Sequence, residues 1–353
     1  MNNTYKSMEK YIPLRLKSDL RSNGLPTLIL LHGVEQLLIN LAVDYIINNF
    51  LNPAFSDFDL ARLDGNAART EDLTEVFETM PYGERKIVCL YNAPHFYGDQ
   101  KQKRDGPKIS HEDFLTFLGN IPTNVCMILV TDKVDKRKSL YKNTKYSYEF
   151  AKLERSMLRG FIEDRYASEG VKIANPTINT LVELTGYLDK DSDYTLMQIN
   201  NDIRKTIAHS NGNEVGKSDV TAVVSATLNT IVFALSDAVS RRKIGEAFMI
   251  LHDLLISGSN NVFSLLGLLF SQLETTLKIR DLIDRGFSKP EIQQMLGIDN
   301  FRLRVLMEHA AGYTTAQLRR IVRNAYEVDN NIKTGLLDQD LALEMFIYEM
   351  CLL

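Results

Sequence analysis

The sequence predicts an α/β domain followed by helical domains, and three observations lead to this fold class. In the first third of the chain, short apolar runs alternate with segments whose apolar residues repeat at helical spacing. Beyond about residue 148 the strand-like runs stop, whereas the helical spacing continues to the end. The 353 residues are enough for two or three domains with buried cores. Strands that alternate with helices indicate a mainly parallel sheet covered on both faces.

The first third contains four expected strands and two clear helices. The strands are residues 27–31 (TLILL), 57–63, 86–91 (KIVCLY) and 125–131 (VCMILVT). One helix is expected over residues 35–50. Another begins at Thr70, where acidic residues in the first turn suit the helix dipole. The apolar face of this second helix comprises Leu73, Val76, Phe77 and Met80.

The rest of the chain is expected to be helical. Helices are predicted over residues 153–169, 179–185 and 193–209, and the turn-forming stretch SNGNEVG at 210–216 follows them. Two capping-box sequences, SKPE from Ser288 and TTAQ from Thr314, each open a later helix, and a last helix covers 338–352. We therefore predict three domains: an α/β domain at 1–147, a small helical lid at 148–216 and a helical collar at 217–353.

Composition excludes several classes of protein. The formal net charge of −4 excludes a protein that is basic over its whole surface and binds nucleic acid in that way. Cys89, Cys126 and Cys351 lie far apart, which argues against a zinc site or disulfide framework and fits a reducing compartment. Residues 1–14 lack the apolar run of a signal peptide, and apolar stretches such as 265–270 are too short to span a bilayer. We expect a cytoplasmic protein without membrane contact.

The turn after the first strand is where a phosphate-binding loop would lie, but its residues do not suit that task. A P-loop needs several glycines, a Lys for phosphate and a Ser or Thr for magnesium. Here Gly33, Val34 and Glu35 provide one glycine and an acid that would repel phosphate. No acid follows KIVCLY, and no two histidines have metal-ligand spacing. We therefore expect no catalytic residue, no cofactor and no metal.

Five segments, in this order, are similar to the delta subunit family of bacterial DNA polymerase III. They are LILLHGVEQLLINLAVDYII, FDLARLDGNAARTEDLTEVFETMPYGERKIVCLYNAPHF, SGSNNVFSLLGLLFSQLETTLKIRDL, KPEIQQMLGI and NIKTGLLDQDLALEMFI. The resemblance extends from about residue 28 to residue 352. Each segment is weakly specific by itself, and the ordered set carries the resemblance.

The resemblance implies an AAA+-like subunit that does not bind ATP. Such a subunit is non-catalytic within a DNA-directed DNA polymerase holoenzyme, which is classed with the nucleotidyltransferases. It joins the gamma/tau ATPase subunits and delta-prime in a clamp-loader ring, and it binds the sliding clamp (beta) and opens it for loading onto primed DNA. The collar joins the subunits, and Met345, Phe346 and Leu352 are candidates for that contact, although packing inside the domain explains them equally well.

The resemblance also places clamp binding in residues 79–83, with Met80, Pro81 and Tyr82 as the contacting side chains. The family commonly has Phe where this chain has Tyr82, and some members have Leu where it has Pro81. From the residues alone, a plainer interpretation is that Met80 completes the buried helix face and Tyr82 packs under a loop. Two other functions also stay open, namely an active AAA+ ATPase with a divergent P-loop and a helical scaffold unrelated to replication.

The residues of the glycine turn predict that this chain does not bind ATP. Titration with a fluorescent ATP analogue and magnesium should give no saturable signal, because the Lys and the Ser or Thr of a P-loop are missing. An ATPase with an intact P-loop is the positive control. Saturable, magnesium-dependent binding would favour the ATPase alternative.

Overall fold

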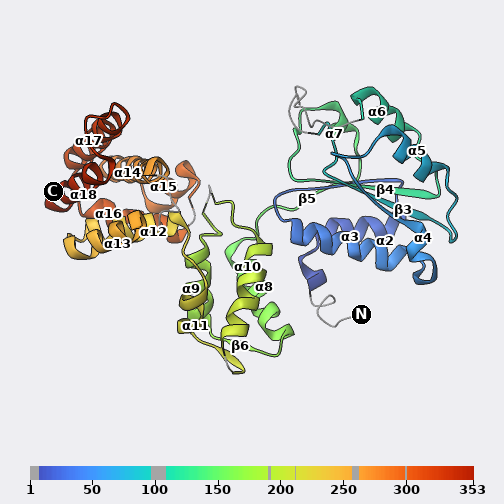
Figure 1. Cartoon of the computed structure of the whole chain (residues 1–353), viewed down its shortest axis with the longest axis horizontal. Helices are drawn as coiled ribbons and strands as arrows, with labels where there is room; N and C mark the ends of the chain where they lie inside the picture. The colour runs from blue at the N-terminus through green and yellow to red at the C-terminus, as the bar shows by residue number, and fades with distance from the viewer. Residues whose placement is uncertain (1–7, 97–108, 190–191, 211, 257–261, 299) are drawn as a thin grey trace. The chain divides into compact units, whose positions relative to one another are not determined.

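The computed structural model describes residues 8–96, 109–189, 192–210, 212–256, 262–298 and 300–353. Two compact units make up the chain (Figure 1). The first unit comprises Met1–Ile178 and Tyr194–Asp219, and the second comprises Asn179–Asp193 and Val220–Leu353. The division into three domains stays a prediction. The fold class agrees with the prediction of a parallel α/β sheet followed by helices.

The first unit is built on a five-stranded parallel sheet. Its strands are β1 (Leu28–His32), β2 (Leu60–Asp64), β3 (Lys86–Tyr91), β4 (Val125–Thr131) and β5 (Ser147–Glu149). They lie in the order β2-β3-β4-β1-β5, and every neighbouring pair is parallel. Strands β3 and β4 match the predicted bounds. Strand β2 begins later than predicted, because residues 56–59 form a short helix, and β5 was not predicted.

Helices cover both faces of this sheet (Figure 1). They are η1 (Glu9–Tyr11), α2 (Leu14–Asn23), α3 (Gln36–Phe50), η2 (Pro53–Phe55), α4 (Ser56–Asp59), α5 (Thr70–Glu78), α6 (His111–Gly119) and α7 (Ser139–Asn143). Helices α2 and α3 lie on one face, and α5 and α6 lie on the other. On the second face, Leu73 of α5 and Phe114 of α6 pack with Leu90 and Leu129 of the strands. This packing fixes α5 against the sheet.

Between β5 and α12, the described residues form four helices and a small sheet, and the last of these helices follows the predicted lid at 148–216. The helices are α8 (Arg155–Ser168), α9 (Asn175–Thr185), α10 (Leu196–His209) and α11 (Lys217–Val223). Strands β6 (Lys172–Ile173) and β7 (Glu214–Val215) pair in parallel. No strand was predicted here, because two residues are too short for an alternating pattern to appear. A buried hydrogen bond of 2.6 Å joins the hydroxyl groups of Tyr166 and Thr206 and ties α8 to α10.

The second unit has a helical core of its own. Most of it is formed by α12 (Leu228–Ser240), α13 (Ile244–Ile256), α14 (Val262–Asp284), α15 (Lys289–Leu296), α16 (Asn300–Ala311), α17 (Thr315–Lys333) and α18 (Gln339–Leu352). Both predicted capping boxes form: the Ser288 N–H donates to the Glu291 carboxylate, and the Thr314 N–H donates to the Gln317 side chain. Among the described helices, none has the length and apolar character needed to cross a bilayer.

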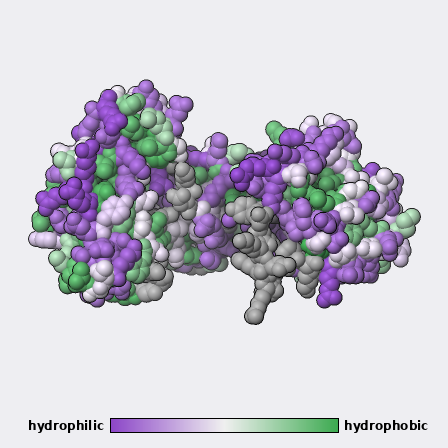
Figure 2. Space-filling model, turned by 90° about the horizontal axis from the view of Figure 1, so that it is seen from above, coloured by the Kyte–Doolittle hydropathy of each residue, from purple (hydrophilic) through white to green (hydrophobic). Residues whose placement is uncertain are grey.

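Helix α18 has apolar residues on two sides. One side joins the core through Leu343, Phe346, Ile347 and Met350. The other side is exposed, and it carries Leu341, Met345, Tyr348 and Leu352 at spacings of four, three and four residues. Of the three residues suggested for subunit contact, Phe346 is therefore a core residue, whereas Met345 and Leu352 are exposed. The face shown in Figure 2 is a mixture of hydrophilic residues and separate apolar patches.

Candidate protein-binding loop

Residues 79–83 connect α5 to β3 and carry two exposed apolar side chains. Met80 is 75% exposed and Tyr82 is 67% exposed, while Pro81 between them is partly buried. Helix α5 ends at Glu78, so Met80 does not complete its buried face, and Tyr82 is not enclosed under a loop. The structure thus brings the three predicted residues together at one accessible turn.

The end of α5 is held by a buried lysine. Pro81 disfavours helical backbone at the residue before it, which limits how far α5 can run. The Lys86 ammonium group donates to the carbonyl oxygens of Val76 (3.1 Å) and Thr79 (3.2 Å), and its side chain is buried. A cation at a helix C-terminus is favoured by the helix dipole and satisfies carbonyls that have no partner within the helix. Lys86 therefore fixes where the loop starts.

The second half of the loop is held by a buried carboxylate. Asp59, at the end of α4, is 1% exposed and accepts hydrogen bonds of 2.7 Å from the N–H groups of both Tyr82 and Gly83. A Cβ atom at position 83 would lie 3.0 Å from the Asp59 carboxylate and 3.6 Å from the Phe55 ring. Glycine permits this close approach. Hydrogen bonds to a charged acceptor are stronger than neutral ones, so the Tyr82 backbone is held in place.

Two further aromatic rings accompany Tyr82. The ring centroids of Phe58, on α4, and Tyr82 are 4.9 Å apart, with 41° between the ring planes. The centroid of the Phe55 ring lies 6.5 Å from that of Tyr82, and these two rings are stacked. Phe58 is itself 62% exposed. Sequence reasoning missed Phe58, Asp59 and Lys86. Asp59 is 23 residues away from Tyr82, and a four-residue helix leaves no periodic signal.

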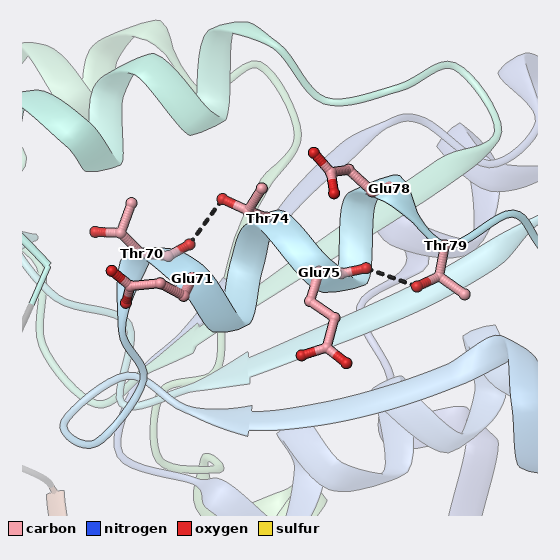
Figure 3. Close-up of a pocket in the computed structure, with 6 residues that line it drawn as sticks. All are labelled: Thr70, Glu71, Thr74, Glu75, Glu78 and Thr79. Carbon is pink, nitrogen blue, oxygen red and sulfur yellow. Dashed lines mark hydrogen bonds between the residues drawn. The ribbon is translucent and has the colours of Figure 1, made fainter.

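Beside the loop, the exposed side of α5 forms a shallow acidic hollow of about 490 Å³. It is lined by Thr70, Glu71, Thr74, Glu75, Glu78 and Thr79 (Figure 3). The hydroxyl groups of Thr74 and Thr79 donate to helix carbonyls one turn earlier. The three glutamates of the lining make the hollow acidic. No basic side chain lines this hollow, so it does not suit a phosphate or a nucleotide.

The turn after β1, where a phosphate-binding loop would lie, is hydrogen-bonded to the end of β4 and to the residue after β5. The Gly33 N–H donates to the Thr131 carbonyl (3.1 Å), and the Glu35 N–H donates to the Phe150 carbonyl (3.2 Å). Gly33 has a φ of 133°, and a Cβ atom there would lie 2.3 Å from the Phe150 oxygen. A phosphate cradle needs N–H groups without protein partners. Here the N–H groups of Gly33 and Glu35 are already paired within the protein.

Glu35 completes the closure of this turn. Its side chain is fully buried, and one carboxylate oxygen accepts a 2.9 Å hydrogen bond from the N–H of Leu196, the first residue of α10. The start of a helix attracts negative charge, because its first N–H groups have no partner within the helix. The carboxylate of Glu35 thus fills the position of an anion at this helix. In the described part of the chain, no group of three His, Cys, Asp or Glu side chains could hold a metal ion.

Comparison with known proteins identifies two regions of this chain with one protein family. Residues 30–153 match the model for "DNA polymerase III, delta subunit", and residues 229–350 match the model for its C-terminal domain. The DNA polymerase III subunit delta of Bacillus subtilis is 26% identical over 332 residues, which cover 91% of each chain. The matches include the loop at 79–83 and, on the exposed face of α18, Leu341, Met345 and Tyr348, whereas Leu352 lies beyond the matched residues.

A solved structure of a delta protein shares the fold of this chain. The Bacillus subtilis DNA clamp loader delta protein has a TM-score of 0.56 with this chain at 22% identity, covering 96% of this chain and 99% of that one. The Thermotoga maritima RuvB branch-migration motor has a TM-score of 0.43 at 12% identity, covering 83% of this chain and 82% of that one. The likeness to the delta protein shows the fold of this chain.

The geometry around Glu35 predicts a structural role for its carboxylate. Glu35→Ala should lower the free energy of unfolding by about 1–3 kcal/mol, because the Leu196 N–H loses its acceptor in a buried position. Glu35→Gln keeps a carbonyl oxygen there and should cost less. Urea unfolding followed by circular dichroism measures both variants. Equal and negligible effects would contradict this role.

Proposed function

We propose that this chain, which belongs to the DNA polymerase III delta subunit family, is the subunit of the clamp loader that binds and opens the sliding clamp. The contact is made by Met80, Pro81 and Tyr82. The observation that carries the proposal is the exposure of Tyr82 on a loop whose backbone is held by buried charged groups. An aromatic side chain presented in this way is a typical binding anchor.

The energetics of such a contact suit a loop that is already ordered. A hot-spot aromatic side chain contributes about 2 kcal/mol or more when it is buried in a partner's pocket. Less of this free energy is lost to ordering when the backbone is fixed before binding. Asp59 and Lys86 fix it from two sides, and Pro81 restricts it further. The loop is therefore suited to insertion into a pocket without rearrangement.

Opening a ring requires no bond chemistry in this subunit. A bound protein shifts an equilibrium between closed and open clamp only by its difference in affinity for the two forms. We propose that the loop binds the open or strained clamp more tightly, and that the gamma/tau ATPase subunits control when the loop is accessible. The glycine turn supports this division of tasks, because the N–H groups of Gly33 and Glu35 are paired with protein carbonyls.

Partner subunits have a second candidate surface on α18. Leu341, Met345, Tyr348 and Leu352 form an exposed apolar face on this helix. We propose that this face contacts the gamma/tau subunits or delta-prime in the assembled loader, which acts in the cytoplasm and reaches primed DNA as a complex. A helix with one apolar face in the core and another in water is typical of an interface.

The clamp contact is tested by the double variant Pro81→Ala/Tyr82→Ala. The variant should lose most of its clamp binding in a pull-down, because the aromatic anchor and the restricted backbone are both removed. Its circular dichroism spectrum should match that of the parent chain, since Tyr82 is mostly exposed. Unchanged clamp binding would refute the assignment of this loop.

The subunit contact is tested by the variant Met345→Ser/Tyr348→Ser. It should co-elute less with the ATPase subunits in gel filtration and should still bind the clamp. Met295→Ser is the matched control, since Met295 is an exposed methionine on α15 of the same unit. Normal assembly of the double variant would exclude the α18 face as the contact.

A further inference from the structure

Phe58 is an exposed phenylalanine beside the proposed clamp anchor, and its exposure has no explanation within the unit itself. Its ring is 62% exposed and lies 4.9 Å from the ring of Tyr82, which is also mostly exposed. An aromatic side chain buries roughly 150–250 Å² when it is enclosed, so leaving two adjacent rings in water forgoes substantial stabilisation. Adjacent exposed rings of this kind are typical of interface hot spots.

Asp59 fixes the position of the Phe58 ring relative to the Tyr82 ring. Phe58 directly precedes Asp59, and the Asp59 carboxylate holds the N–H groups of Tyr82 and Gly83 at 2.7 Å. Phe55 stacks behind Tyr82 from the turn before α4. A pocket that receives the Tyr82 ring therefore meets the Phe58 ring in a fixed relation to it. The two rings form one surface, although 24 positions separate them in the sequence.

Charge beside this surface indicates what surrounds the partner's pocket. Glu71, Glu75 and Glu78 lie on the exposed side of α5, which leads directly into Met80 (Figure 3). Glu78 stands at the helix C-terminus, where the helix dipole disfavours an acid, and Glu71 and Glu75 are like charges one turn apart. Both arrangements cost stability locally, and a basic partner surface would compensate for them.

We infer that Phe58 and Tyr82 together form a paired aromatic anchor, and that the clamp pocket receiving it has a basic margin that faces Glu75 and Glu78. The inference rests on the proposed clamp-binding function and adds a contact residue and a charge requirement to it. A second copy of this chain fits less well, because the same acidic helix would then border the contact from both sides.

Affinity measurements on single variants test the aromatic pair. Phe58→Ala should weaken clamp binding about tenfold or more, as expected for a hot-spot residue. Tyr82→Ala should do the same, and the double variant should lose less than the product of the two factors, because the rings are in contact. Leu14→Ala is the matched control, since Leu14 is an exposed apolar residue on α2 of the same unit. Thermal melting verifies that each variant is folded.

The outcomes separate this inference from the proposed function. If Tyr82→Ala weakens binding while Phe58→Ala behaves like Leu14→Ala, the paired anchor is wrong and the loop assignment stands. If neither variant affects clamp binding, both are wrong. A dimer of this chain that Phe58→Ala dissociates would overturn the choice of partner.

A spectroscopic probe reports on Phe58 independently of affinity. The chain contains no tryptophan, so Phe58→Trp labelled with 5-fluorotryptophan has a single fluorine signal. Added unlabelled clamp should shift this ¹⁹F resonance and leave that of a Leu14→Trp chain unchanged. A stationary resonance at position 58 while the clamp is bound would overturn the inference.

The basic margin is tested by Glu75→Gln/Glu78→Gln. This variant should bind the clamp more slowly at low ionic strength and show a flatter dependence of the association rate on salt, because attraction between opposite charges speeds encounter. Asp340→Asn, which removes an acidic side chain from α18 of the second unit, is the control. Identical salt dependence in the variant and the parent chain would refute the charge requirement.

Discussion

One buried carboxylate, that of Asp59, determines how this chain presents its candidate binding surface. It accepts hydrogen bonds from the N–H groups of Tyr82 and Gly83, and it belongs to the same short helix as Phe58. A buried charge is costly unless it is fully hydrogen-bonded, and here the loop backbone provides the donors. The same interaction therefore satisfies Asp59 and fixes the loop. Lys86 has the equivalent role at the end of α5, where its ammonium group meets helix carbonyls.

In the glycine turn, too, polar groups find their partners within the protein. Backbone N–H groups need acceptors, and in this turn the N–H groups of Gly33 and Glu35 donate to the carbonyls of Thr131 and Phe150. The Glu35 carboxylate then takes the position at the start of α10 that an anion would otherwise occupy. The turn after β1 and helix α10 are thus joined by an internal acid, which provides the negative charge at the start of the helix.

Each of the two units carries one candidate binding surface. The first unit presents rigid aromatic side chains next to an acidic helix, whereas the second presents an apolar helix face above its own core. In the proposed function, neither surface requires bond chemistry, and both act through differences in binding free energy. This agrees with a family whose members work as subunits of a larger replication assembly.

Local patterns in the sequence determined strands β3 and β4, the capped starts of α15 and α17, and the absence of a P-loop, because each depends on residues close together in the chain. Family resemblance added the loop at 79–83. Strands β5, β6 and β7 were missed, since strands this short show no alternation. Only the tertiary structure decided that Phe346 is buried while Met345 is exposed, and that Phe58 and Asp59 meet Tyr82. These relations join elements far apart in sequence, and packing in three dimensions alone brings them together.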